Sequence, residues 1–95
     1  MFSLNNVENQ NEKVFLITGA NSGLGYETSK FLLKKGATVI MCCRDLVKGE
    51  KAMQKLLKLN YYGNIELFEL DLSDLINVKQ FADQIKNKFN YIDVL

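Results

Sequence analysis

The chain has 95 residues, of which 47% are hydrophobic and 24% are charged, a composition typical of a globular protein rather than a disordered one. Its formal net charge is +1 at pH 7, so charge indicates neither nucleic acid nor an anionic membrane as a partner. The sequence contains no histidine, which excludes histidine acid–base catalysis and histidine metal ligands within it, and we expect no metal site.

Residues 1–12 are polar and rich in asparagine. They contain no apolar run long enough for a signal peptide or a membrane span, so we expect a flexible leader and no membrane segment. The only cysteines, Cys42 and Cys43, are adjacent, which fits neither a zinc site nor an ordinary disulfide. We expect buried free thiols that point to opposite faces of a strand. Free thiols fit a reducing, intracellular and cytoplasmic location.

From residue 13 onward the chain alternates between short apolar runs and longer segments. Strands are expected at residues 13–18, 37–43 and 64–71, because these runs are apolar, rich in β-branched residues and too short for helices. A fourth apolar run begins at residues 91–95, where the chain stops.

Helices are expected between these strands. The first follows a glycine-rich loop and ends at Gly36, the second occupies residues 45–60, with Asn60 and Gly63 marking its end, and the third begins at Ser73 as N-cap. Each has apolar residues at helical spacing that predict a buried face. In the first helix this face comprises Leu24, Thr28, Phe31, Leu32 and the stem of Lys35. In the second it comprises Ala52, Met53, Leu56 and Leu57, and in the third Leu75, Val78, Phe81, Ala82, Ile85 and Phe89.

This alternation of strand and helix predicts an α/β fold with a doubly wound parallel sheet and right-handed crossovers. The sequence contains no proline, so nothing excludes any of these runs from a central strand. We expect the amino-terminal half of a Rossmann-like fold, with strand order 3-2-1-4.

The loop TGANSGLG at residues 18–25 lies between the first strand and the first helix. In that context, Gly19 allows a sharp turn, Gly23 allows the backbone to approach a pyrophosphate, and Gly25 allows close packing of the helix on the sheet. The helix N-terminus would then face the anion. The alternative is a loop whose glycines serve only turning and packing. The candidate cofactor-binding residues here are Thr18, Gly19, Asn21, Ser22, Gly23, Leu24 and Gly25.

TGANSGLG resembles the cofactor motif of the classical short-chain dehydrogenase/reductase family. CCRD at residues 42–45 and KGE at 48–50 are similar to its retinol dehydrogenase branch, and LDLSDL at 70–75 resembles the family's adenine-contacting turn. The resemblance implies that residues 13–95 are the amino-terminal part of an NAD(P)-binding Rossmann domain that ends within its fourth strand.

The resemblance also indicates which dinucleotide binds. NAD-preferring members of the family tend to carry Asp about where Cys43 stands, whereas here Arg44 follows an uncharged residue. A cation at this strand end would meet the 2′-phosphate of NADP, so NADP is expected and NAD is less favoured. The alternative is a solvated Arg44 near Asp45. By resemblance, the Asp71 carboxylate accepts from the adenine amino group and the Leu72 backbone lines the same pocket. Alternatively or in addition, Asp71 caps the helix that follows.

The segment YETSK contains the Tyr-x-x-x-Lys spacing of the family's catalytic pair. Tyr26 and Lys30, however, lie in the first turns of the helix that follows the glycine-rich loop, and the family places its pair far downstream. At about 100° per residue they fall nearly opposite the predicted apolar face, so we expect them to point away from the sheet, toward solvent or a neighbouring segment. We therefore expect no catalytic residue in this chain.

The resemblance implies an enzyme when the protein is complete: an NADP(H)-dependent oxidoreductase transferring hydride between nicotinamide and an alcohol or carbonyl carbon. The substrate would be apolar, such as a retinoid, a steroid or a lipid aldehyde or ketone. The alternatives are a non-catalytic nucleotide-binding module and a truncated relic. An edge strand and uncovered helix and sheet faces predict marginal stability, self-association and a possible homo-oligomer.

Overall fold

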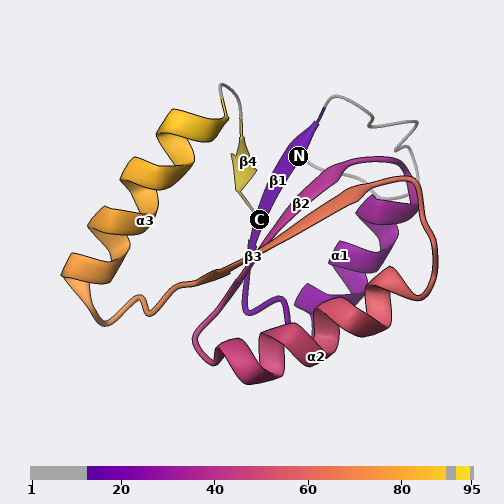
Figure 1. Cartoon of the computed structure of the whole chain (residues 1–95), viewed down its shortest axis with the longest axis horizontal. Coiled ribbons are helices and arrows are strands. Elements are labelled where there is room, and N and C mark those ends of the chain that lie inside the picture. The colour runs from indigo at the N-terminus through magenta and orange to yellow at the C-terminus, as the bar shows by residue number, and fades with distance from the viewer. Residues whose placement is uncertain (1–12, 90–91, 95) are drawn as a thin grey trace.

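The computed structural model describes residues 13–89 and 92–94, so the prediction of a flexible leader at residues 1–12 lies outside it. The elements follow the predicted alternation (Figure 1). They are β1 (Val14–Thr18), α1 (Gly23–Lys34), β2 (Thr38–Cys43), α2 (Leu46–Leu57), β3 (Asn64–Glu69), α3 (Leu75–Lys88) and β4 (Asp93–Val94). The strands form one parallel sheet in the order β3-β2-β1-β4, which confirms the predicted α/β fold and strand order.

Strand β2 occupies the centre of the sheet and is buried from Val39 to Cys43. Its side chains alternate between the two faces. Met41 and Cys43 join the core beneath α1 and α2, whereas Ile40 and Cys42 join the core beneath α3. The prediction that the two cysteines are buried, free and on opposite faces is confirmed.

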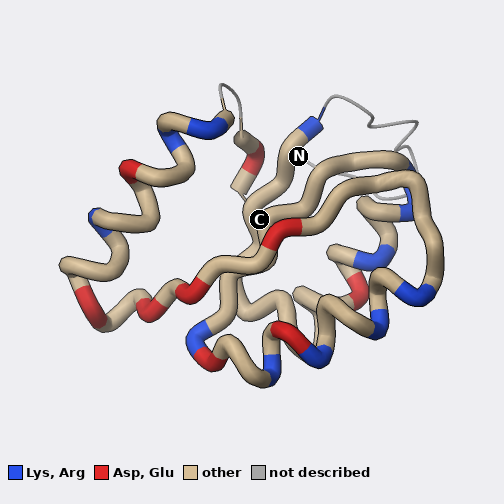
Figure 2. The backbone as a smooth tube through the Cα atoms, in the orientation of Figure 1, with Lys and Arg blue, Asp and Glu red and all other residues tan. Residues whose placement is uncertain are grey.

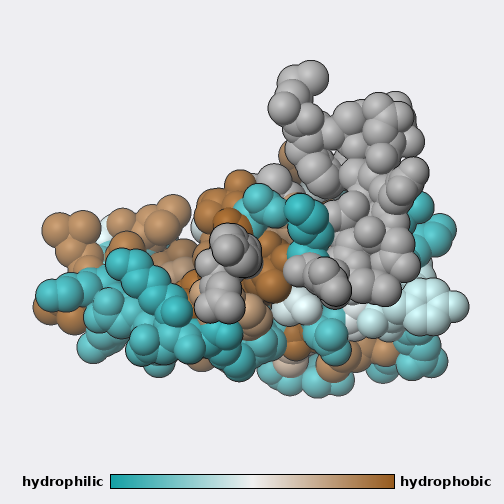
Figure 3. Space-filling view, turned by 90° about the horizontal axis from the view of Figure 1, so that it is seen from above, coloured by the Kyte–Doolittle hydropathy of each residue, from teal (hydrophilic) through white to brown (hydrophobic). Residues whose placement is uncertain are grey.

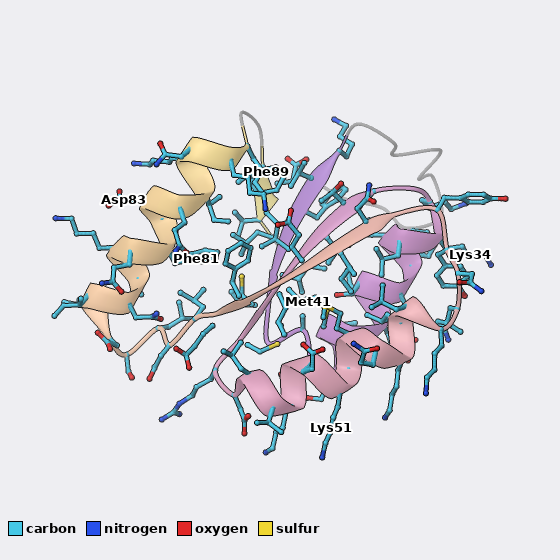
Figure 4. The ribbon with its side chains drawn as sticks, viewed as in Figure 1. Lys34, Met41, Lys51, Phe81, Asp83 and Phe89 are labelled. Atoms are coloured by element: carbon cyan, nitrogen blue, oxygen red, sulfur yellow. The ribbon has the colours of Figure 1, made fainter. Side chains whose placement is uncertain are left out.

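Helices α1 and α2 cover one face of the sheet, where Leu32, Leu33 and Leu56 pack against the Met41 side of β2 (Figures 1 and 4). The predicted apolar face of α1 is partly wrong. Leu24 is 81% exposed, and the fully buried Ser29 occupies the inner face instead, with its hydroxyl donating to the Gly25 carbonyl at 2.8 Å.

The ends of these helices largely follow the sequence prediction. Gly36, with a φ of 89°, ends α1 in a Schellman motif: its N–H donates to the Leu33 carbonyl and the Ala37 N–H to the Leu32 carbonyl. Helix α2 begins at an Asp45 N-cap, whose carboxylate accepts from the N–H groups of Val47 and Lys48. Helix α2 ends at Leu57, before Asn60, which adopts a φ of 54°. In the predicted apolar face of α2, Ala52 and Leu56 are buried and Leu57 is 48% exposed.

Helix α3 covers the opposite face of the sheet, to which it is attached mainly by Phe81 and Ile85. Phe81 points toward the sheet and meets Phe68 edge to face at 5.6 Å, whereas Asp83 points away (Figure 4). The predicted apolar stripe is wrong at its beginning, because Leu75 is 81% exposed.

The N-cap prediction at α3 is also wrong. The cap is Asp74, whose carboxylate accepts from the N–H groups of Ile76 and Asn77. Ser73 does not cap the helix because its hydroxyl and its N–H both donate to Asp71.

Hydrophobic side chains remain exposed at the α3 end of the molecule (Figure 3). Among them, Leu72, Leu75 and Ile76 have exposed fractions of 66%, 81% and 72%. In the part of the chain that the structure describes, no helix combines the length and the apolar character needed to cross a bilayer.

The buried thiols give a testable pH dependence. Burial, with a smaller contribution from neighbouring Cys43, raises the pKa of Cys42 from 9.0 to about 12, and burial also raises that of Cys43. The unfolded chain therefore releases these protons first, and the thiol contribution to the free energy of unfolding should be complete below pH 9 and decline toward pH 12. Urea unfolding of the parent and of Cys42→Ala at several pH values between these limits measures this contribution. The free energy of unfolding should decline more steeply with pH in the parent than in the variant. Rapid reaction of both thiols with a disulfide reagent under native conditions would contradict the burial.

Candidate functional site

The candidate site lies at the carboxyl end of the parallel sheet, where the loops after β1, β2 and β3 meet. Ligands of open α/β sheets bind at this edge. A cavity of about 350 Å³ opens between the loops. It brings together six of the residues that the sequence predicted for cofactor binding: Thr18, Gly19, Asn21, Arg44, Asp71 and Leu72. The remaining lining residues are Cys42, Leu70 and Ser73.

The loop after β1 leaves the N-terminus of α1 open. Gly19 turns the chain with a φ of 61°, and its N–H donates to the Cys42 carbonyl. Ser22 is the N-cap of α1, yet its side chain makes no capping hydrogen bond, and no acidic residue lies in the first turn. Helices α2 and α3 are each capped by an aspartate. Within residues 13–89 and 92–94, the first N–H groups of α1 are therefore the ones left without a capping side-chain acceptor, an arrangement suited to an anion.

Gly23 keeps the space above this helix end clear. It has a φ of 58°, and a Cβ atom built on it would meet no heavy atom within 4 Å. The missing side chain is therefore required by backbone conformation and not by packing within the protein. Leu24 follows and is 81% exposed. The geometry leaves room for a ligand at the N–H groups of α1.

Gly25 serves a different contact from the one predicted. A Cβ atom on Gly25 would lie 2.4 Å from the Gly19 carbonyl oxygen and 3.1 Å from the Ala20 Cα. The close approach is therefore between α1 and its own loop, whereas the sequence placed it between the helix and the sheet. The loop is thus held in shape by direct backbone packing.

Cys43 supports the same loop from below, a role that sequence reasoning missed. Burial raises the pKa of its thiol, and hydrogen bonds from the N–H groups of Ala20 and Asn21 partly oppose that shift. The sulfur therefore faces the loop backbone. A sequence signal for this position of Cys43 was present. Cys43 is the last residue of β2 and lies on the sheet face that α1 and α2 cover.

Arg44 and Asp71 face each other across the 350 Å³ cavity. The Arg44 Nε lies 3.8 Å from the Asp71 Oδ2. The other carboxylate oxygen, Oδ1, accepts from the Ser73 hydroxyl at 2.6 Å and from the Ser73 N–H at 3.0 Å. These two bonds, with a smaller contribution from Arg44, hold the pKa of Asp71 below its usual value. Asp71 therefore accepts two hydrogen bonds from Ser73 in the turn before α3 and still lines the cavity, whereas the alternative that Asp71 caps α3 is wrong, because the cap is Asp74.

A second cavity, of about 710 Å³, lies on the outer side of Arg44. Figure 2 shows acidic and basic residues side by side at this start of α2. Arg44 and Lys48 supply positive charge, and Asp45 and Glu69 supply negative charge. The Asp45 carboxylate is bonded to the N–H groups of α2, whereas Arg44 pairs with Asp71 and keeps 81% of its side chain exposed, as the alternative of a solvated arginine expects. Sequence reasoning missed Lys48, although its place in the first turn after Arg44 was a sufficient signal.

Tyr26 and Lys30 lie apart from the 350 Å³ cavity, whose lining includes neither. Of the two surroundings expected for Tyr26, solvent or a neighbouring segment, the structure shows the second, because Tyr26 is partly buried against the core beneath α1 and α2. It also lines a groove of about 490 Å³ between the two helices, together with Ser22, Gly23 and three lysines of α2.

Known proteins are similar to this chain in sequence and fold. Residues 13–95 match the short chain dehydrogenase family. The WW domain-containing oxidoreductase of Gallus gallus is 43% identical over 80% of this chain and 18% of its own length. Retinol dehydrogenase 12 of Mus musculus is 40% identical over 76% of this chain and 23% of its own.

A solved structure agrees with these relatives. Menthone neomenthol reductase of Mentha piperita superposes with a TM-score of 0.77 at 35% identity, over 86% of this chain and 30% of that one. The chain thus spans less than a third of the length of each of these proteins. The family match extends over most of the sequence, and the glycine loop, the strand order and the cavity at the carboxyl edge agree with it: the chain belongs to the short-chain dehydrogenase/reductase family of oxidoreductases.

Proposed function

We propose that this chain holds the adenosine and pyrophosphate portion of NADP(H) in an oxidoreductase that transfers hydride between nicotinamide and an alcohol or carbonyl carbon. The observation that carries the proposal is the open N-terminus of α1, where Ser22 makes no capping bond and Gly23 leaves the adjoining space clear. A pyrophosphate placed there accepts from backbone N–H groups and lies at the positive end of the helix dipole.

The adenosine would occupy the 350 Å³ cavity beside this helix end. Asp71 would accept from the adenine amino group through Oδ2, because Oδ1 is already engaged by Ser73. The backbone of Leu72 lines the same wall. These groups orient the dinucleotide. The nicotinamide itself supplies or accepts the hydride when it is bound.

The choice of NADP over NAD rests on the charges around Arg44. The side chain of Arg44 is 81% exposed and is directed by a single ion pair, so it is free to turn toward a 2′-phosphate. Lys48 lines the same outer cavity. Of the two acids there, Asp45 is held by the N-terminus of α2, and β2 ends in Cys43 with no carboxylate to bind ribose hydroxyls.

The proposed substrate is an apolar alcohol or carbonyl compound, such as a retinoid, a steroid or a lipid aldehyde or ketone. Support comes from the names of a retinol dehydrogenase and a menthone neomenthol reductase among the relatives. A reducing, intracellular location is supported by the two buried free thiols. Self-association is supported by the exposed side chains of Leu75 and Ile76.

The cofactor preference can be tested on the chain itself. NADPH should bind at least about tenfold more tightly than NADH, because a guanidinium–phosphate contact is charge-assisted and forks to two oxygens. Arg44→Ala should remove most of that difference. Lys34→Ala, which removes an exposed cation at the far end of α1, should leave it intact. Dissociation constants from NMR titration of the ¹⁵N-labelled chain give the comparison, and equal affinities of the parent for the two cofactors would contradict the assignment.

The pyrophosphate position can be tested by filling the space above Gly23. Asparagine tolerates a positive φ, as Asn60 already shows in this chain, so Gly23→Asn should fold with a loss of stability of about 1 kcal/mol. Its side chain would enter the space proposed for the pyrophosphate and should weaken NADPH binding about tenfold or more. Lys34→Asn places the same side chain on the exposed far end of α1 and should bind as the parent does. NADPH affinity in Gly23→Asn equal to that of the parent would exclude the site.

A further inference from the structure

We propose that Asp71 sets the strength of the preference for a 2′-phosphate, because it holds Arg44 in the ligand-free protein and the phosphate must displace it. The inference rests on the proposed NADP site. It assigns Asp71 a second role beside its contact with adenine, that of a competitor for the phosphate-binding arginine.

The pairing of the strands brings the two groups together. Arg44 follows the last residue of β2, and Asp71 lies just past the end of β3. Cys43 and Glu69 are partners in the parallel register, and the Leu70 N–H donates to the Cys43 carbonyl at 3.0 Å. The two loops therefore leave the sheet side by side, which places the Arg44 Nε 3.8 Å from the Asp71 Oδ2.

Asp71 is the fixed member of this pair. Its Oδ1 accepts two hydrogen bonds from Ser73, and its own N–H donates to the Asn77 side chain at 2.7 Å. These bonds secure both its carboxylate and its backbone, and they keep the carboxylate ionised. Only one-third of the Asp71 side chain is exposed, against 81% for Arg44. When the contact opens, Arg44 is the group that moves.

Arg44 also lies between the two places where a ligand would need it. It lines the 350 Å³ cavity together with Asp71 and the 710 Å³ cavity together with Lys48. A 2′-phosphate on the outer side draws Arg44 away from Asp71, whereas the uncharged ribose hydroxyls of NAD have no comparable attraction. The Asp71 Oδ2 has a second lone pair for the adenine amino group that both cofactors carry, so the cost of opening its pair with Arg44 falls on NADP binding alone.

The size of the effect follows from exposure. An exposed ion pair with one contact near the distance limit is weak, so its loss should change affinity by about twofold to fivefold. Asp71→Asn retains an acceptor for Ser73 while removing the charge. Asp74→Asn is the matched control, because Asp74 is a nearby carboxylate that caps α3 and makes no ion pair with Arg44 in the described residues. Asparagine is an equally good N-cap, so α3 should be preserved.

The experiment compares adenosine 2′,5′-bisphosphate with adenosine 5′-monophosphate, which differ only in the 2′-phosphate. Both are titrated into the parent and each variant by NMR, and the ratio of their affinities is taken so that any loss of adenine binding cancels. The ratio should rise about twofold to fivefold in Asp71→Asn and stay constant in Asp74→Asn. In an Arg44→Ala background, Asp71→Asn should leave the ratio unchanged.

The ligand-free protein provides a second measurement. The Nε–Hε signal of Arg44 should shift in Asp71→Asn and remain in place in Asp74→Asn. An unshifted signal in Asp71→Asn, a constant or lower ratio, or an equal rise in Asp74→Asn or in the Arg44→Ala background would overturn this inference while leaving the NADP site intact. Failure of the parent to bind either nucleotide would overturn the proposed site and this inference together.

Discussion

The burial of β2 on both faces is the constraint on which the remaining structure depends. Because β2 pairs in parallel with β1 on one side and β3 on the other, the carboxyl ends of these strands lie at one edge of the sheet. The loops that follow must therefore converge there, and the polar residues they carry form a single cavity. The two cores, one beneath α1 and α2 and one beneath α3, share β2 as their common wall.

The hydrogen bonding at the helix N-termini distinguishes the capped ends of α2 and α3 from the open end of α1. Asp45 and Asp74 satisfy the first N–H groups of α2 and α3 within the protein. The corresponding groups of α1 receive no side-chain acceptor from Ser22, and the backbone packing of Gly25 on Gly19 holds the loop in that open form. The loop that enters α1 is thus held by backbone packing, which limits the ordering required when a ligand binds.

The charged side chains around Arg44 are mixed in sign and do not form a positive patch. Arg44 and Lys48 lie among Asp45, Glu69 and Asp71. A site of this kind attracts anions weakly at long range and discriminates through particular contacts. This arrangement makes the position of Arg44 more informative than the number of basic residues around it. It also explains why the net charge of +1 gave no indication of the ligand.

The sequence alone determined the order of the elements, the parallel sheet and the residues of the glycine loop, because strand length, helical spacing and glycine position reflect local physics. It could not determine which side of α1 is buried, because that depends on how the helix packs on the rest of the fold, where Ser29 is buried and Leu24 is exposed. It likewise could not distinguish Ser73 from Asp74 as the cap of α3, or identify Asp71 as the partner of Arg44. Those choices were made by competition among neighbouring polar groups, and only the tertiary structure places the competitors within reach of one another.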